Sequence, residues 1–257
     1  MKIGFLDSGI GGLSVLHNIL LRKPTGDYLY YADSDNAPYG EKSEEEVCAL
    51  VSAGVDFLIG QGAEAVVLAC NTATSVAARR LRAVHSIPIV GMEPAVKPAV
   101  TFHGGGRVLV TGTPVTIRGE RLADLIDTVD RERLTEKLAL PELVRMAEER
   151  RFDTRAAADY IRRELADGSP EAYSAVVLGC THFNYFKDAF RLVFPESTAI
   201  VDGNDGTVSQ LIRRVGEESL VGGGSVTYYR SGRLASARER EDNTALLSRL
   251  DEMYRIK

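Results

Sequence analysis

The sequence predicts an α/β protein made of two similar doubly wound parallel-sheet domains that face each other across a cleft. Apolar stretches of strand length alternate with helical patterns along the 257 residues, which is typical of βαβ units and a parallel sheet. One phrase also occurs twice, because residues 65–72 read AVVLACNT and residues 175–182 read AVVLGCTH. In addition, residues 107–127 repeat the outline of the amino terminus, with an apolar strand, a polar turn and a helix.

Each copy of the repeated phrase ends its apolar run with a small residue and a cysteine. A continuous apolar run suits a strand that is buried on both faces of a parallel sheet. Cys70 and Cys180 therefore fall at the carboxyl ends of strands, where open α/β sheets bind ligands. The N-terminus of the following helix favours the thiolate there. Most free cysteines are small core residues, but two at matched strand ends favour a functional role.

The elements of the first half follow from the spacing of its apolar residues. Strands are expected at residues 2–6, 29–32, 65–68 and 87–90, and helices at residues 13–21, 43–61 and 74–84. Ser43 and Glu46 form a capping-box pattern at the start of the second helix. Cys48 lies within that helix, far from any strand end, so we interpret it as a packing residue.

A glycine-rich turn that begins with Asp7 and Ser8 follows the first strand. Such a turn can bring backbone N–H groups close to an anion, but the spacing of a dinucleotide fingerprint is absent. Asp7 would repel a phosphate, so it could attract an ammonium group or orient a neighbouring acid or base; alternatively, it only caps the helix. A second turn, at residues 37–40, exposes Tyr39 and the N–H of Gly40.

The second half continues the same alternation of strands and helices. Strands are expected at residues 107–110, 175–178, 199–201 and 226–230, and helices at residues 116–127, 141–150, 154–165, 185–192, 206–215 and 239–254. Pro94 and Pro98 mark the first crossing between the halves. We therefore expect one domain at residues 1–97 plus 206–257, carrying Cys70, and a second at 98–205, carrying Cys180. The closing helix should pack on the first domain.

Two facing lobes of this kind would place one thiol on each side of a small substrate. Inversion at a carbon acid needs this arrangement, because one base removes a proton from one face while a second acid delivers a proton to the other. Asp7 can assist Cys70, whereas His182 and Glu148 can assist Cys180. The side chains that could hold a carboxylate and an ammonium group, together with the Gly40 N–H, are Ser8, Asn71, Thr72, Thr113, Thr116 and Thr181.

Six short motifs resemble the glutamate racemases of the aspartate/glutamate racemase superfamily. In chain order they read DSGIGGLS, APYG, ACNTAT, PAVKPA, GTPVT and GCTH, and they extend over nearly the whole chain. The resemblance implies a cofactor-independent two-base racemase that supplies D-glutamate for peptidoglycan. It implies Cys70 and Cys180 as the paired bases, with assistance from Asp7, Glu148 and His182. The substrate-binding residues that it implies are Ser8, Tyr39, Gly40, Asn71, Thr72, Thr181 and His182.

The chain departs from the usual pattern of these racemases in three places. Residues 183–186 read FNYF where the family has an aromatic-proline-leucine stretch, and residues 34–36 are more polar than usual. Residues 138–142 read LALPE in place of a Cys-Pro-rich stretch, which leaves both Glu148 and Glu149 as candidates for the assisting carboxylate.

Three other functions remain open from the sequence. A racemase of the same superfamily could act on aspartate or another amino acid. A two-lobed solute-binding protein would need no paired thiols and would normally carry an export signal. A single-thiol hydrolase could use Cys180 and His182, but Cys70 would then have no role. A metal site is not expected, because the four histidines and the separated cysteines match no zinc spacing.

Composition limits the partners and the location. The net charge of −5 offers no basic footprint for nucleic acid, and no apolar run reaches membrane-spanning length. Three cysteines fit free thiols in a reducing compartment better than a disulfide framework. The amino terminus reads directly into a strand, without the pattern of a signal peptide. We therefore expect a cytoplasmic protein that binds a small molecule and neither nucleic acid nor a membrane. A homodimer is also expected, as a separate expectation that composition does not supply.

Overall fold

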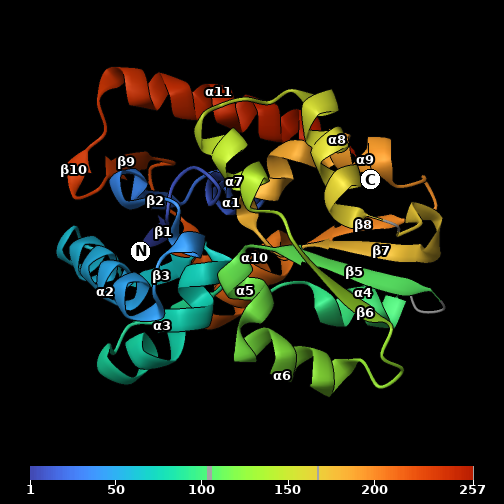
Figure 1. The fold of residues 1–257 in the computed structure, drawn as a ribbon. Helices are drawn as coiled ribbons and strands as arrows, with labels where there is room; N and C mark the ends of the chain where they lie inside the picture. Colours follow the sequence, from blue (N-terminus) through green and yellow to red (C-terminus); the bar gives the residue numbers. More distant parts are fainter. Residues whose placement is uncertain (103–105, 167, 257) are drawn as a thin grey trace.

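The structure is a computed structural model that describes residues 1–102, 106–166 and 168–256, and it contains two separate sheets (Figure 1). The first lobe is built on a six-stranded sheet and the second lobe on a four-stranded sheet. In spatial order the first sheet contains β10 (Arg233–Leu234), β9 (Val226–Arg230), β2 (Asp27–Ala32), β1 (Lys2–Asp7), β3 (Ala65–Leu68) and β4 (Ile89–Gly91). The second contains β6 (Thr135–Ala139), β5 (Arg107–Gly112), β7 (Tyr173–Leu178) and β8 (Ala199–Asp202).

Apart from the antiparallel pair of β10 and β9, neighbouring described strands in both sheets run parallel. Successive side chains of a strand point to opposite faces, so each sheet needs cover on both sides. The first sheet has α2 (Glu44–Gly60) and α3 (Asn71–Val84) on one face, and α1 (Leu13–Arg22) and α10 (Asn204–Val215) on the other. The fold class expected from the sequence is therefore confirmed.

The second sheet is covered in the same way. One face packs against α4 (Val96–Phe102) and α6 (Glu120–Val129), and the other against α7 (Pro141–Glu148), α8 (Thr154–Leu165) and α9 (Lys187–Val193). A short helix, α5 (Pro114–Arg118), precedes α6. The remaining short helical turns are η1 (Ser34–Asn36), η2 (Tyr39–Glu41), η3 (Pro170–Ala172), η4 (Thr181–Phe186) and η5 (Glu217–Leu220).

Several helices begin or end where the sequence pattern did not place them. Helix α3 begins at Asn71 rather than at residue 74, because the Cys70 sulfur accepts a hydrogen bond from the Ala73 N–H and caps the first turn. The helix expected at residues 116–127 is divided into α5 and α6 at Gly119. Strand β6 was not expected at all, since its residues TEKLA are half-buried and carry two charges.

The chain returns to the first lobe after building the second. Helix α10 packs against α1, and strand β9 pairs with β2 (Tyr28↔Val226 through Ala32↔Arg230). These contacts support the division into residues 1–97 plus 206–257 and residues 98–205, which we keep as a proposal.

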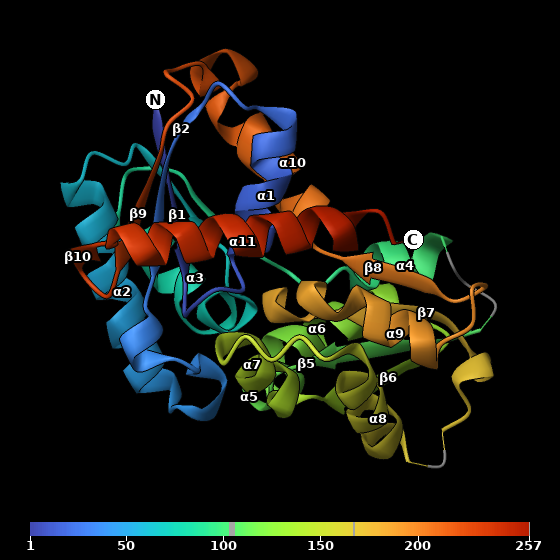
Figure 2. The same ribbon diagram turned by 90° about the horizontal axis from the view of Figure 1, so that it is seen from above.

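The closing helix α11 (Ala237–Tyr254) lies across both lobes, as Figure 2 shows. It packs on α1 of the first lobe, as expected, and it also contacts η4 of the second. Arg249 donates to the Tyr185 carbonyl (3.0 Å) and Asp242 pairs with Arg150 (2.8 Å). Helix α11 therefore ties the two lobes together, which the sequence did not predict. Among the described residues, no helix has both the length and the apolar character needed to cross a membrane.

Candidate active site

The two cysteines that end the repeated phrase line one cavity between the lobes. Cys70 follows β3 as the N-cap of α3, and Cys180 follows β7 as the N-cap of η4. Both are buried. The other residues around this cavity are Ser8, Pro38, Tyr39, Gly40, Asn71, Thr72, Thr113, Val144 and His182. The carboxyl ends of parallel strands from both sheets thus meet here, as the sequence predicts.

Cys70 is buried in the first lobe, at its side of the cavity. Its sulfur lies 3.9 Å from the Ser8 hydroxyl and accepts from the Ala73 N–H at 3.4 Å. Burial, and then the negative charge of Asp7, raise the pKa of the Cys70 thiol to about 12. Cys70 therefore favours the protonated form before any ligand binds.

A chain of hydrogen-bonding groups faces Cys180 from the second lobe. The Cys180 sulfur lies 3.7 Å from His182 Nδ1, and His182 Nε2 lies 2.6 Å from Glu148 Oε1. Burial alone would lower the pKa of His182, but its bonds to Cys180 and Glu148 hold that pKa well above the usual value. Burial likewise opposes ionisation of Glu148, but His182 and the Ile10 N–H keep its pKa below the usual value. The pair therefore favours an imidazolium beside Cys180.

The structure distinguishes Glu148 from Glu149, the two residues that the sequence left as candidates for the assisting carboxylate. Glu148 points into the site, where Oε1 accepts from the Ile10 N–H at 2.9 Å. Glu149 is an exposed residue whose carboxylate pairs with Arg151 at 2.6 Å. Of the two, only Glu148 contacts His182 in the described structure.

Asp7 lies between the two walls rather than beside Cys70 alone. It is fully buried, accepts from the Gly9 N–H at 2.9 Å, and accepts from the Thr181 hydroxyl at 3.4 Å. Burial raises the pKa of Asp7, and the nearby His182 opposes that rise. Asp7 can therefore interact with both halves of the site.

The glycines of the first turn make room for side chains of the second lobe. A Cβ atom at Gly9 would overlap the Glu148 carboxylate, and one at Gly11 would overlap the His182 ring. The sequence had suggested that these glycines expose backbone N–H groups to an anion. The structure shows that the anion at this turn is a carboxylate of the protein itself, since Glu148 accepts from the Ile10 N–H.

The polar residues predicted to bind a ligand differ in whether their side chains already have hydrogen-bond partners in the protein. Both side-chain amide atoms of Asn71 are buried and have no hydrogen-bond partner among the described residues. The Tyr39 hydroxyl, in contrast, donates to Asp33 at 2.6 Å, so it can offer a ligand an acceptor oxygen but no proton. Thr72 and Thr113 lie 3.0 Å apart through their hydroxyls, and Thr116, which does not line the cavity, lies 3.1 Å behind Thr113.

Sequence analysis missed the buried phenols behind the turn. The Tyr30 hydroxyl donates to the Gly9 carbonyl at 2.8 Å, and the Tyr185 hydroxyl donates to the Ile10 carbonyl at 3.0 Å. Tyr30 stands inside an apolar strand, where no sequence signal separates it from a packing residue. Tyr185 does fall in the stretch that departs from the family pattern.

The cavity between the cysteines is small. Its volume is about 10 Å³, which is the room that about one water molecule needs. A ligand of amino-acid size can therefore reach both thiols only if residues around this cavity move apart.

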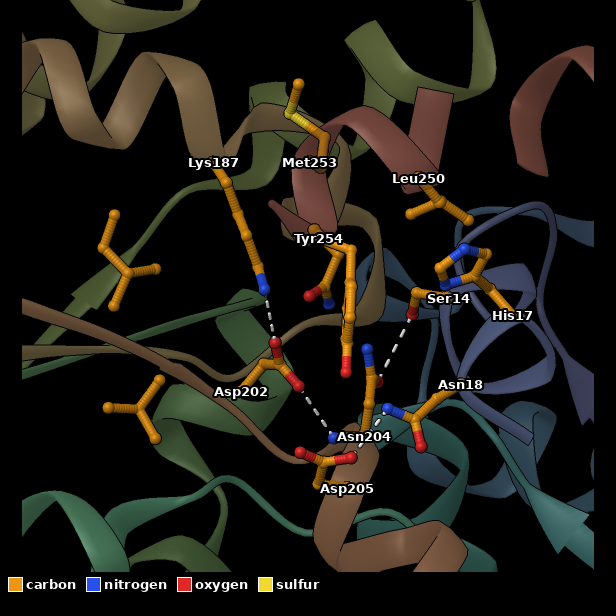
Figure 3. A pocket seen from close by; sticks show the side chains of 13 residues that line it. Ser14, His17, Asn18, Lys187, Asp202, Asn204, Asp205, Leu250, Met253 and Tyr254 are labelled. Atoms are coloured by element: carbon orange, nitrogen blue, oxygen red, sulfur yellow. Dashed lines mark hydrogen bonds and ion pairs between the residues drawn. The ribbon is translucent and has the colours of Figure 1, made fainter. Parts of the chain in front are cut away.

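A second cavity of about 250 Å³ is lined by residues of α1, α10, α11 and β8, among others (Figure 3). In the close-up, Lys187 reaches Asp202 (2.7 Å) and Asn18 reaches Asp205 (2.8 Å). None of the site residues expected from the sequence lines it. The chemistry that the sequence predicts therefore belongs to the smaller cavity.

Comparison with known proteins agrees with this geometry. The model of the Asp/Glu/hydantoin racemase family matches residues 17–211. The chain belongs to this family. The resemblance seen in the sequence motifs is thereby confirmed, and racemases are isomerases.

Relatives in this family match the chain over its whole length. The glutamate racemase of Lachnospira eligens is 48% identical over 265 residues and that of Campylobacter curvus 46% over 266, with 100% of both chains covered in each case. The crystal structure of Escherichia coli glutamate racemase, in complex with L-glutamate and the activator UDP-MurNAc-Ala, superposes with a TM-score of 0.84. It is 30% identical and the match covers 97% of this chain and 94% of that one.

Proposed function

We propose that this chain is a glutamate racemase that inverts the α-carbon with two cysteine bases and no cofactor. One observation carries the proposal: Cys70 from the first lobe and Cys180 from the second line the same cavity. Relatives named glutamate racemase, 41–48% identical to this chain, support the substrate. Independence from a cofactor rests on the resemblance of the site motifs.

The reaction requires one thiolate and one thiol. In one direction the Cys180 thiolate takes the α-proton and leaves an electron pair on the α-carbon, and the Cys70 thiol then donates its proton to the opposite face. In the other direction the two sulfurs exchange roles. Each turnover converts the thiolate into a thiol and the thiol into a thiolate, so protons and charge balance. Such positioned acid–base groups typically contribute a factor of about 10²–10⁴ each.

The surrounding residues divide into helpers and substrate ligands in this proposal. Glu148 holds the positive charge of the His182 ring, whose Nδ1 lies 3.7 Å from the Cys180 sulfur. Asp7 assists on the side of Cys70. The groups that would hold the substrate are Ser8, Tyr39, Gly40, Asn71, Thr72, Thr113, Thr181 and His182, while Thr116 would support Thr113 from behind.

Incubation with L-glutamate in D₂O tests the proposed function. We expect the optical rotation to decay to zero while deuterium enters the α-position, because the donated proton comes from a thiol that exchanges with solvent. L-aspartate is the parallel substrate. Faster decay with L-aspartate would favour the alternative racemase of the same superfamily, and no α-exchange with either substrate would contradict two-base chemistry.

The superfamily match makes the other two functions less suitable. A solute-binding protein has no use for a thiol on each wall of its cleft. A hydrolase based on Cys180 and His182 would leave Cys70 without a role, although it lines the same cavity.

Two further proposals concern the cellular context. Supply of D-glutamate for peptidoglycan, in the cytoplasm, would be supported if the gene restores growth to a bacterium that requires D-glutamate. A homodimer would be supported by a sedimentation coefficient for twice the chain mass; a monomer would contradict it.

Asn71 offers a prediction that separates binding from stability. Its two unpartnered buried amide atoms cost stability in the free protein, about 1–3 kcal/mol for such a group. We expect Asn71→Leu, which keeps the branched shape, to raise the melting temperature and to raise KM for glutamate about tenfold. Thermal unfolding and steady-state kinetics measure both. An unchanged KM would remove Asn71 from the set of substrate ligands.

A further inference from the structure

The peptide group between Gly9 and Ile10 connects a core tyrosine to the catalytic site. On one side, the Gly9 carbonyl accepts from the Tyr30 hydroxyl at 2.8 Å. On the other side, the Ile10 N–H donates to Glu148 Oε1 at 2.9 Å. The C=O and N–H of one trans peptide point in opposite directions in a rigid plane. A group that fixes the carbonyl therefore also fixes the direction of the N–H.

Tyr30 is well suited to hold this peptide. It lies on β2, is only 1% exposed, and contacts the Tyr228 ring edge-on at 6.2 Å between centroids. Burial raises the pKa of Tyr30 well above its usual value, so its hydroxyl remains a proton donor at any working pH. From the second lobe, Tyr185 holds the next carbonyl, that of Ile10, at 3.0 Å.

Glu148 depends on few hydrogen bonds. Within the described structure its carboxylate accepts from the Ile10 N–H and interacts with His182 Nε2. Other charged or titratable groups face it without such a bond. They are Cys180 behind His182, Asp7 on β1, Tyr30, Tyr185, Arg230 on β9, and Arg145, Glu149 and Arg150 around the adjoining pocket.

We propose that Tyr30 is a positioning residue for the hydrogen-bonded chain of Glu148, His182 and Cys180 in the second lobe. By holding the Gly9–Ile10 peptide, Tyr30 keeps the Ile10 N–H directed at the Glu148 carboxylate. This carboxylate in turn keeps the His182 ring protonated, and that ring faces Cys180. The catalytic meaning of this role rests on the proposed racemase function, whereas the effect on His182 does not.

The sign of the effect follows from the hydrogen bond. Donation to the ionised form lowers the pKa of a carboxyl group. A weaker Ile10 N–H bond therefore raises the pKa of Glu148. It also frees the carboxylate to shift away from His182 Nε2, which now lies 2.6 Å from Glu148 Oε1. A more distant carboxylate stabilises the imidazolium less, so the pKa of His182 falls. The pH profile of kcat/KM should therefore become narrower. The higher pKa of Glu148 moves its acidic limb to higher pH, and the lower pKa of His182 moves its alkaline limb to lower pH.

Tyr30→Phe tests the proposal, with Tyr28→Phe as the matched control. Tyr28 lies on the same strand and packs in the same core cluster, and its hydroxyl also donates to a backbone carbonyl, that of Lys23, at 2.7 Å. Each substitution removes one phenol–carbonyl bond, which is buried for Tyr30 and part-buried for Tyr28, but of the two only Tyr30 bonds to a peptide that reaches the site. NMR titration of the His182 ring in the free protein, assigned with His182→Asn, gives the first measurement.

We expect Tyr30→Phe to lower the pKa of His182 by about half a unit to one unit, the size of a typical environmental shift, and Tyr28→Phe to leave it unchanged. With glutamate, kcat/KM should fall about tenfold for Tyr30→Phe only, which is a loss typical of a displaced catalytic group. Tyr185→Phe should give a smaller shift of the same sign, and it replaces Tyr30→Phe if that variant does not fold.

The two proposals fail in different ways. If the pKa of His182 is the same in the wild-type protein, in Tyr30→Phe and in Tyr185→Phe, the positioning role is wrong, even if the activity of the variants changes. A wild-type protein that does not racemise glutamate would overturn the proposed function, while the titration would still decide the role of Tyr30.

Discussion

Cys70→Ala and Cys180→Ala should each reduce racemisation to less than about one thousandth of the wild-type rate, within the range of a lost acid–base group. Each variant keeps one working sulfur on one face of the substrate, but inversion needs both. The substitutions are small, and circular dichroism should show an unchanged fold. Cys48→Ala is the matched control, because this cysteine lies in α2 and lines no part of the site.

Proton exchange in the same variants distinguishes two bases from one. Cys70→Ala retains Cys180, which can still take the α-proton of one enantiomer and return a deuteron from the same face in D₂O. Cys180→Ala should do so with the other enantiomer. NMR of the recovered glutamate measures this exchange. Racemisation near the wild-type rate in either variant, or exchange of both enantiomers by one variant, would refute the two-base assignment.

The walls of this site could be predicted from the sequence because they depend on local patterns. The phrase AVVL followed by a small residue and Cys specifies a buried strand and its carboxyl end at once. Parallel pairing then brings such ends to the same edge of a sheet. Strand β3 has the expected bounds, and helix α8 begins and ends where its apolar period predicts.

The contacts between the walls could not be predicted in this way. The bond from Ile10 to Glu148 joins residues 138 positions apart, and no local pattern encodes that distance. The same holds for Tyr30, whose role depends on which carbonyl its hydroxyl reaches. Strand β6 was missed for a different reason. It lies at a sheet edge with half-buried residues, so it lacks the apolar run that identified the central strands.

Helix α11 shows how charge contacts can add to a packing predicted from topology. Its chain position predicts packing on the first lobe, and it does contact α1 there. Arg249, however, pairs with Asp188 at 3.1 Å, and Asp242 pairs with Arg150, both in the second lobe. A motion that separates the lobes must therefore break these contacts or carry α11 with one lobe.

The Cys70 side and the Cys180 side of the site should also respond differently when the assisting residue of each, Asp7 or His182, is replaced. His182 Nδ1 lies 3.7 Å from the Cys180 sulfur, whereas burial and the charge of Asp7 raise the pKa of Cys70. Enantiomers have equal free energies in water, so any variant must lower kcat/KM by the same factor in both directions. The difference therefore has to be sought in which proton transfer limits the rate.

The primary isotope effect with α-deuterated glutamate reports that step. In His182→Asn, transfer to or from Cys180 becomes slower. For the enantiomer that Cys180 deprotonates, the deuteron leaves in the slow step, so its isotope effect should rise. For the other enantiomer the slow step uses a solvent-derived proton, so its isotope effect should fall. The exchange experiment with Cys70→Ala identifies which enantiomer Cys180 deprotonates.

Asp7→Asn should change the two isotope effects in the opposite sense, because Asp7 assists the transfer at Cys70. The position of Asp7 makes this a demanding test, since its carboxylate also accepts from Thr181 on the wall of Cys180 at 3.4 Å. If the isotope effects change in the same direction in both variants, Asp7 assists proton transfer at Cys180 rather than at Cys70. Unchanged isotope effects, with a raised KM, would instead mean that both residues bind substrate and do not tune the individual thiols.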